Sequence, residues 1–412
     1  MVSRIGETFE RWGYQRIITP AFEYQATLAR GLGEEAAARA MKFVEPETGE
    51  VVALRPDFTP QVARLVATRL GGQPGPLRLF YEGSVVRLGG SATPDRELFQ
   101  AGIELIDAPS PAGDLEVVAL LAALLQAVGL APFTIDLGTV ELARAALAGV
   151  GEPGALHQAI ARKDGDEVAR RARGLALPAR QRRLLEALPF LCGGREVLER
   201  AAKLLSAEQP AARRGLAELR TIVEHLEALG LGDHLAIDLG EVRGFDYYTG
   251  VRFQAFAAGV GEAIASGGRY DRLVERYGRA ARAAGLAVDI DGLSRALARG
   301  QENQTFGRRT ALLVSGEALL SARLAALLRT TGACVVQDLA PQSGSRRRLS
   351  QVALAADLQR VYVVKSTGLE WFASDGRARG RLGRSQLQAI LSGAAPIKQL
   401  LLEPLATGKD RA

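Results

Sequence analysis

Hydrophobic residues recur at helical spacing in some stretches of the chain and alternate with polar residues in others. Near the N-terminus, Ile5, Phe9 and Trp12 are three or four residues apart, which predicts a helix over residues 2–12. Further along, the turn-rich segment 45–50 separates two short apolar runs. This arrangement predicts a β-hairpin.

Two longer runs, 77–87 and 98–106, predict strands joined by a polar, glycine-rich loop. In the second strand, Gln100, Gly102 and Glu104 share one face, and apolar residues occupy the other. A buried glutamine and a buried glutamate need hydrogen-bond partners. A ligand or the protein itself could supply them, and the pattern leaves both open.

The segment before these strands carries further candidate ligand groups. Residues 54–60 read LRPDFTP, with Thr59 placed to cap a helix over 61–69 and Pro60 at its first position. Asp57 and Thr59 therefore lie at a strand-to-helix junction. They either face a ligand or only cap the helix.

The middle of the chain is mostly helical in pattern. Residues 114–128 predict an apolar helix capped near Asp114, and 133–137 predict a strand. Residues 141–232 are rich in Ala, Leu and Arg at helical spacing, and 235–239 again predict a strand. We interpret 141–232 as a helical insertion between strands of the main sheet.

The segment 238–270 carries two clusters of aromatic and guanidinium groups beside glycines. They are RGFDYYTG at 243–250 and GGRYD at 267–271, next to strand-like runs at 247–256 and 260–266. Glycine lets a main chain approach closely, tyrosine offers an apolar wall with a polar tip, and arginine binds carboxylates through two N–H groups. Such groups can enclose a small polar ligand. A tyrosine-rich hairpin with a glycine turn is the structural alternative.

The C-terminal quarter changes to alternating strands and helices after a polar segment at 299–306 that we interpret as a linker. The pattern predicts a compact α/β domain over 307–412 that follows a larger domain over 1–300. The expected elements are strands at 310–314, 334–338, 360–364 and 371–373 and helices at 318–328 and 385–391.

Composition narrows the function classes. The 412 residues are 47% hydrophobic and 24% charged, as in ordinary globular proteins, and no apolar stretch is long enough to span a membrane. Cys192 and Cys334 are too few for a disulfide framework, which fits the cytoplasm, and the three histidines lack metal-ligand spacing. The net charge of +6 is spread along the chain, and only 346–348 forms an arginine run, interpreted as a solvated loop. We expect no metal, cofactor or nucleic-acid partner from these features.

In their order, these segments resemble the motifs of histidyl-tRNA synthetase and related class II synthetases over residues 10–298. Pro20 stands where that family's first motif has its proline. The matching segments are LRPDFTPQVAR at 54–64, YEGSVVR at 81–87, ELFQAGIEL at 97–105, RGFDYYTG at 243–250 and GGRYDRLVERYG at 267–278. The resemblance implies an α+β fold with an antiparallel sheet flanked by helices. It also implies that 307–412 is a reduced anticodon-binding domain.

The resemblance further implies a histidine-binding pocket. The matching positions supply acceptors for an ammonium and an imidazole N–H, rings for the imidazole, and a cation for the carboxylate. They are Asp57, Thr59 and Gln100 for the amino group, Glu104, Tyr248 and Tyr270 for the imidazole, and Arg243 beside the carboxylate.

The nucleotide side departs from the family pattern. Arg87 is followed by Gly89 and no carboxylate, and Leu98 takes the place of an adenine-stacking phenylalanine, although Phe99 is adjacent. Gly292 stands where the third motif has an arginine that offsets triphosphate charge. This departure implies that synthetase activity is lost.

The sequence combines an intact amino-acid site with a degraded nucleotide site. In this combination it resembles the regulatory subunits of ATP phosphoribosyltransferase, which are synthetase paralogues. The shared segments are DLGEVRGFDYYTG, LPFLCGGREVLERA at 188–201, and GGRYD followed by GLAVDID. The resemblance implies a noncatalytic partner of a short catalytic subunit in the first step of histidine biosynthesis. It would transmit feedback inhibition by histidine and form a homodimer around Pro20. The alternatives are an active histidine–tRNA ligase and a synthetase-like protein of another pathway.

Overall fold

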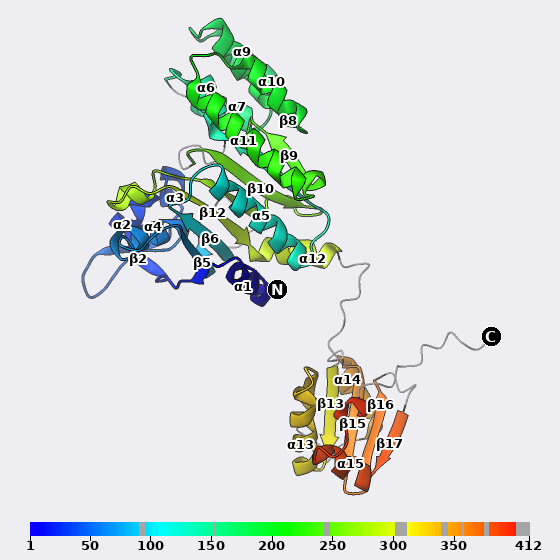
Figure 1. Cartoon of the computed structure of the whole chain (residues 1–412). Coiled ribbons are helices and arrows are strands. Elements are labelled where there is room, and N and C mark those ends of the chain that lie inside the picture. The colour runs from blue at the N-terminus through cyan, green and yellow to red at the C-terminus, as the bar shows by residue number, and fades with distance from the viewer. Residues whose placement is uncertain are drawn as a thin grey trace, which may run out of the picture. The chain divides into compact units, whose positions relative to one another are not determined.

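The computed structural model describes residues 1–89, 96–151, 153–242, 248–300, 311–338, 345–355, 358–374 and 379–400. The chain forms two compact units, Met1–Asn303 and Gln304–Ala412 (Figure 1). Most of the linker expected at 299–306 lies outside the described residues, but Arg299 still belongs to a helix.

The first unit is built on a nine-stranded sheet. Its neighbouring strands run antiparallel, except for the parallel pairs β1–β5 and β7–β9. In spatial order the strands are β1 (Gln15–Arg16), β5 (Leu77–Val86), β6 (Glu97–Ile106), β12 (Ala283–Asp289), β11 (Ala265–Arg269), β10 (Val251–Ala257), β7 (Phe133–Thr139), β9 (Leu235–Asp238) and β8 (Cys192–Gly193). The α+β architecture with a largely antiparallel sheet is confirmed.

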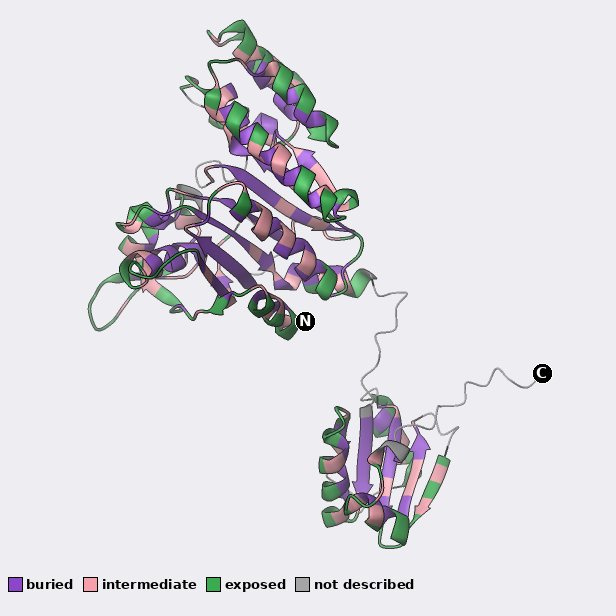
Figure 2. Ribbon diagram, in the orientation of Figure 1, coloured by how far each residue is buried: buried purple, intermediate pink, exposed green. Residues whose placement is uncertain are grey.

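One face of this sheet is apolar and covered by helices. The helices that share its core are α1 (Val2–Arg11), α5 (Ala112–Ala127), α11 (Pro210–Ala228) and α12 (Ile290–Gly300). Alternate residues of a strand face opposite sides, so Ala101, Ile103 and Leu105 of β6 enter this core. Their neighbours Gln100, Gly102 and Glu104 therefore face the other side. Figure 2 shows the central strands as almost entirely buried.

Between β7 and β9 the chain is mostly helical. The helices of this segment are α6 (Val140–Leu147), α7 (Gly154–Ala161), α8 (Gly165–Arg173), α9 (Ala179–Ala187), α10 (Glu196–Leu204) and α11, with the 3-10 turns η1 (Leu188–Phe190) and η2 (Gly232–His234). The insertion also supplies the two-residue strand β8, which pairs with β9. Its apolar side chains join the core of the large sheet.

A small three-stranded sheet is formed by residues between β1 and β5 of the large sheet. Its strands are β2 (Phe22–Tyr24), β4 (Val51–Leu54) and β3 (Lys42–Val44), and the nearby helices are α2 (Gln25–Gly31), α3 (Glu34–Ala38) and α4 (Thr59–Thr68). The expected hairpin of β3 and β4 is confirmed. Between α2 and α3 the chain is extended at Leu32.

Three local predictions need correction. Thr59 is the first residue of α4 and not its cap; instead the Asp57 carboxylate accepts a hydrogen bond from the Thr59 N–H at 3.0 Å. Asp114 lies inside α5 and pairs with Arg269 at 2.9 Å. The strand-like run expected at 260–266 is displaced, because β11 begins at Ala265 and includes both glycines of GGRYD.

The second unit has a five-stranded sheet with helices on both faces. In spatial order its strands are β14 (Cys334–Gln337), β13 (Ala311–Gly316), β15 (Arg360–Lys365), β16 (Gly368–Ala373) and β17 (Arg379–Gly383). Helices α13 (Ala318–Arg329) and α15 (Arg384–Leu391) share one core, and α14 (Arg346–Ala355) packs in another. The remaining 3-10 turns are η3 (Val274–Tyr277) in the first unit and η5 (Ile397–Leu400) in the second.

The sequence pattern missed α14 and β17 in this unit. The arginine run at 346–348, expected in a solvated loop, forms the first turn of α14. Across the described parts of both units, no helix has the length and apolar character required to cross a bilayer.

Candidate functional site

The other face of the large sheet gathers glycines and polar side chains through the register of its strands, and part of it packs against α4 and η3. Tyr81 of β5 lies opposite Gly102 of β6, and Glu104 lies opposite Gly285 of β12. Gly285 in turn lies opposite Gly268 of β11. The absence of side chains at these glycines leaves room directly above the sheet for the polar groups around them.

Glu104 is the centre of this arrangement, with only 1% of its surface exposed. Burial raises the pKa of its carboxyl group well above the usual range. Hydrogen bonds from the hydroxyls of Thr59 and Tyr81 act in the opposite direction, and the nearby Asp57 raises the pKa further. The Oε2 atom has no hydrogen-bond partner among the described residues. A buried acceptor of this kind is ready for a ligand N–H.

Gly285 lets two polar side chains pack directly against the strand backbone. A methyl group added at this glycine would lie 2.3 Å from Glu104 Oε2 and 2.4 Å from the Tyr270 hydroxyl. The two polar atoms therefore converge on one point above the Gly285 Cα. Because Tyr270 is also buried, this point combines an acidic group and a phenol within an enclosed site.

Tyr248 forms another wall of the same site. Its ring packs over Gly268, where an added Cβ would lie 2.8 Å from the ring. Burial raises the pKa of the Tyr248 phenol, and the carboxylates of Asp57 and Glu104 raise it further. The phenol therefore remains protonated at neutral pH and can donate a hydrogen bond.

The helical insertion holds both ends of the segment that leads into Tyr248. At its start, Lys163 pairs with Asp238 at 2.6 Å, and the same carboxylate accepts from the Gly240 N–H at 2.9 Å. At its end, Arg144 of α6 donates to the Tyr248 carbonyl at 2.5 Å. The position of the Tyr248 ring therefore depends on contacts made by the insertion.

A buried cation also lies beside Tyr248. The Arg252 guanidinium is 6.0 Å from the ring centroid and pairs with Glu241 at 3.4 Å. Burial lowers the pKa of Arg252 to about 10, while Asp238 and Asp136 act in the opposite direction. Arg252 remains charged at neutral pH and extends the polar face toward β7 and β9.

A cavity of about 200 Å³ lies next to Gln100 at the other end of this face. Arg87, Gly89 and Leu98 all line it, together with the carboxylate-bearing Asp289. The other lining residues are Arg39, Glu262, Ala263, Ile264, Ala265, Ser266 and Ala287. Arg87 donates through Nε to the Pro56 carbonyl at 2.7 Å, which holds its side chain at the rim.

Acidic and basic groups balance in this cavity. Arg39 and Arg87 carry positive charge, and Glu262 and Asp289 carry negative charge. Gly292, in the first turn of α12, adds no side chain, and a methyl group there would lie 2.7 Å from Asp289 Oδ2. Among the described residues, the lining of the cavity therefore carries no excess of positive charge for a triphosphate.

The structure brings most of the sequence-predicted site residues together. Asp57, Thr59, Glu104 and Tyr248 interact electrostatically or through hydrogen bonds, and Tyr270 meets Glu104 above Gly285. Gln100 lines the adjoining cavity. Arg243 lies outside the described residues.

Sequence reasoning missed several residues of the site. Tyr81 was quoted only as part of a motif, although it is fully buried and stacks on Phe58 with ring centroids 4.2 Å apart. Its pairing with Gly102 was the available signal, because a Cβ there would lie 2.4 Å from the Tyr81 hydroxyl. Asp289 and Glu262 lie far apart in sequence from Arg87, and only the folded sheet brings them to the same cavity. Across the described residues, no group of three or more His, Cys, Asp or Glu could hold a metal ion.

Comparison with known proteins supports the architecture and identifies the family. The family model for histidyl-tRNA synthetase matches residues 1–293. The ATP phosphoribosyltransferase regulatory subunit of Syntrophotalea carbinolica is 40% identical, with 85% of each chain covered. A crystal structure of an ATP phosphoribosyltransferase regulatory subunit/histidyl-tRNA synthetase from Bacillus halodurans has a TM-score of 0.74 at 30% identity, covering 88% of this chain and 92% of that one.

Histidyl-tRNA synthetase from Nostoc also superimposes with a TM-score of 0.74, at 20% identity, covering 95% of this chain and 94% of that one. At this identity the likeness supports only the shared fold. The proteins from Syntrophotalea carbinolica and Bacillus halodurans are 40% and 30% identical over most of the chain, which shows the family as well as the fold. The chain belongs to the family of ATP phosphoribosyltransferase regulatory subunits, which is built on the histidyl-tRNA synthetase fold.

Proposed function

We propose that this chain is a noncatalytic regulatory subunit of ATP phosphoribosyltransferase that binds free histidine and conveys its inhibition to a short catalytic subunit. The observation that carries this proposal is the contrast along one sheet face. A buried, unpaired carboxylate oxygen of Glu104 faces the amino-acid site, while the adjoining cavity balances its arginines with Asp289 and Glu262.

Histidine suits the amino-acid site in each of its parts. The imidazole N–H can donate to Glu104 Oε2, beside the Tyr270 hydroxyl. Asp57 and Thr59 lie on the same side of Glu104 and can accept from the ammonium group. We assign the imidazole to Glu104, Tyr248 and Tyr270, the ammonium to Asp57, Thr59 and Gln100, and the carboxylate to Arg243.

Adenylation needs positive charge where the triphosphate loses pyrophosphate. Gly292 supplies no cation, and Asp289 adds a carboxylate to the same cavity. We propose that synthetase activity is absent for this reason. The competing function, a histidine–tRNA ligase, is favoured by one observation, the presence of Arg39 and Arg87 in that cavity.

A homodimer is part of the proposal, and exposed apolar residues support it. Phe22, Tyr24, Phe43 and Val44 of the small sheet are between 42% and 61% exposed, and Ile18 before it is 88% exposed. The rings of Phe22 and Phe43 contact each other edge to face, with centroids 6.1 Å apart. Contiguous exposed apolar groups of this kind mark interaction surfaces. We place the dimer contact here, near Pro20.

The experiment that tests the proposal is reconstitution with a short ATP phosphoribosyltransferase catalytic subunit. The complex should turn over substrate and lose activity as histidine is added, whereas the Glu104→Ala complex should keep its turnover and resist histidine. The Glu97→Ala variant is the matched control, because Glu97 is exposed at the start of the same strand. Failure to associate, or equal inhibition of both variants, would refute the assignment.

The proposed function also bears on the cellular compartment and on tRNA as a partner. Cys192 and Cys334 are both exposed and unpaired, which supports a reducing cytoplasm. We do not assign tRNA as a partner, because the described lining of the cavity beside Gln100 has no excess of positive charge that would attract a nucleic acid.

A further inference from the structure

The second unit has an open, basic face on its sheet. Strand register places Arg379 opposite Phe372 and Arg381 opposite Glu370. Residues directly opposite each other share a face of the sheet, so both arginines lie on the side of Phe372. Trp371 points to the other side, into the core shared with α13 and α15.

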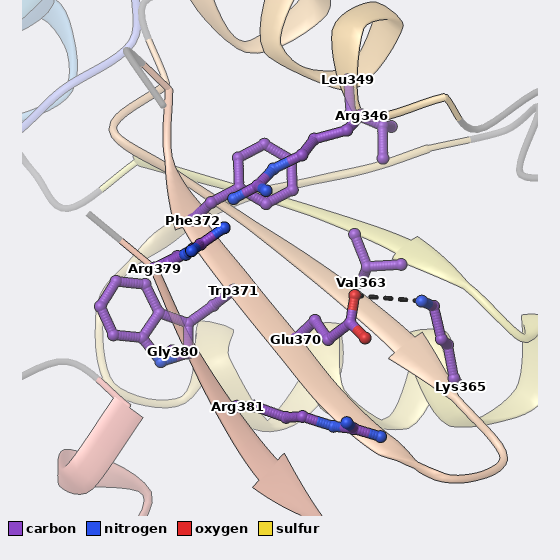
Figure 3. Close-up of a pocket in the computed structure, with 10 residues that line it drawn as sticks. All are labelled: Arg346, Leu349, Val363, Lys365, Glu370, Trp371, Phe372, Arg379, Gly380 and Arg381. Atoms are coloured by element: carbon purple, nitrogen blue, oxygen red, sulfur yellow. Dashed lines mark hydrogen bonds and ion pairs between the residues drawn. The ribbon is translucent and has the colours of Figure 1, made fainter. Parts of the chain in front are cut away.

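Helix α14 covers only part of this face. Leu349 and Phe372 pack in one small core, and the Arg346 guanidinium lies 4.7 Å above the centroid of the Phe372 ring. Beyond the helix, a groove of about 580 Å³ remains open between α14 and strands β15 to β17 (Figure 3). Its floor includes the partly buried side chain of Val363.

The charges around the groove are strongly unequal. Among the described residues that line it, the basic groups are Arg346, Lys365, Arg379 and Arg381, and the one acidic group is Glu370. Glu370 pairs with Lys365 at 3.0 Å, and within the described residues neither Arg379 nor Arg381 forms an ion pair. The groove therefore keeps an excess of positive charge.

The local backbone adds to this positive potential. Helix α14 begins at Arg346, and the start of a helix carries partial positive charge. Arginines in the first turn of a helix are unfavourable for that reason. Arg379 and Arg381 also repel each other, because residues two apart on a strand share a face. A bound anion would relieve both effects.

We propose that this groove binds a small phosphate-bearing ligand of nucleotide size. Planar guanidinium groups match phosphate oxygens through paired N–H donors. The volume falls in the range of about 300–1,000 Å³ that is usual for small-molecule sites. Val363 provides an apolar surface for the organic part, and the exposed side of Arg346 can stack on a planar ring.

The test is calorimetric titration of the full-length chain with ATP and, separately, with inorganic tripolyphosphate. Both should bind, and Arg379→Gln/Arg381→Gln should weaken both at least tenfold. Arg384→Gln is the matched control, since Arg384 is exposed at the start of α15 and does not line the groove. A thermal melt of each variant confirms that it is folded.

Further arms separate this site from other sources of binding. Arg87→Gln, in the cavity of the first unit, should leave ATP binding unchanged. The proposal is overturned if neither probe binds, if Arg87→Gln abolishes binding, or if Arg384→Gln weakens it as much as the double variant. Tighter binding of an acidic peptide or an RNA oligonucleotide at the same arginines would also overturn it, because the groove would then serve a macromolecule.

Discussion

Replacing Glu104 with glutamine should make the stability of the unliganded protein depend less on pH. Burial raises the pKa of the Glu104 carboxyl group well above the usual range. The folded protein therefore holds a proton that the unfolded chain releases above a pH of about 4.5. Under these conditions, folding stability falls as pH rises from that value to the folded-state pKa. Glutamine has no such proton and removes this dependence.

The magnitude follows from one proton. Within this pH window, the stability of the wild type should fall by about 1.4 kcal/mol per pH unit relative to Glu104→Gln. The comparison uses the slope and not the absolute difference, because glutamine also changes the hydrogen bonds with Thr59 and Tyr81. Burial also raises the pKa of Asp114. Because Asp114 is present in both proteins, its contribution to the pH dependence cancels in the comparison.

The assay is chemical unfolding of both proteins at intervals from pH 5 to pH 9, without histidine. Glu97→Gln serves as the control, because this residue is exposed on the same strand. Parallel stability curves for the wild type and Glu104→Gln would refute the claim that the folded state shifts the Glu104 pKa. In calorimetry, Glu104→Ala, which removes the acceptor, should weaken histidine binding by about 1–3 kcal/mol, or roughly fivefold to 150-fold.

The remaining predictions address the insertion, the nucleotide side and the dimer. Lys163→Met removes the contact with Asp238 and should lower histidine affinity several-fold in calorimetry with little change in melting temperature; unchanged affinity would show that the insertion does not position the pocket. Gly292→Arg should gain no ATP–pyrophosphate exchange, because a side chain there must displace the neighbouring Asp289 carboxylate, which would still offset the new charge. Exchange by this single variant would contradict this prediction. Phe22→Ser, at a side chain 50% exposed, should convert a dimer into a monomer in analytical ultracentrifugation, and a monomeric wild type would contradict the proposed contact.

Periodicity predicted the elements whose faces differ clearly in polarity. The alternation in β6 placed Gln100 and Glu104 on one face, and the structure buries both. The turn residues at 45–50 likewise predicted the hairpin of β3 and β4. In these segments, local pattern and tertiary burial agree, because one side of each strand must exclude water.

The local sequence could not predict features that depend on residues far along the chain. Asp114 has the residue type of a helix cap, but its position is set by Arg269, far along the chain. Gly267 weakens the strand pattern of β11, yet a Cβ there would lie 2.3 Å from the Gly285 carbonyl oxygen. The close approach of neighbouring strands therefore requires glycine where propensity disfavours it.

The missed elements of the second unit have a related cause. Helix α14 opens with arginines, which oppose the helix dipole, and its stability comes from burial of Leu349 and Ala353. Edge strand β17 alternates arginine with glycine and leucine, a pattern with little apolar content. Charges on an edge strand discourage pairing with other chains. They also leave the strand without the apolar alternation by which a strand is predicted from sequence.

The measurement that tests the central claim most directly is ATP–pyrophosphate exchange by the purified chain at saturating histidine. The account predicts that calorimetry detects histidine binding and that exchange stays at the level of a blank without protein. Histidine-dependent exchange would show that the cavity beside Gln100 still supports adenylation despite Gly292 and Asp289. The chain would then act as a ligase, and the proposed regulatory role would be contradicted.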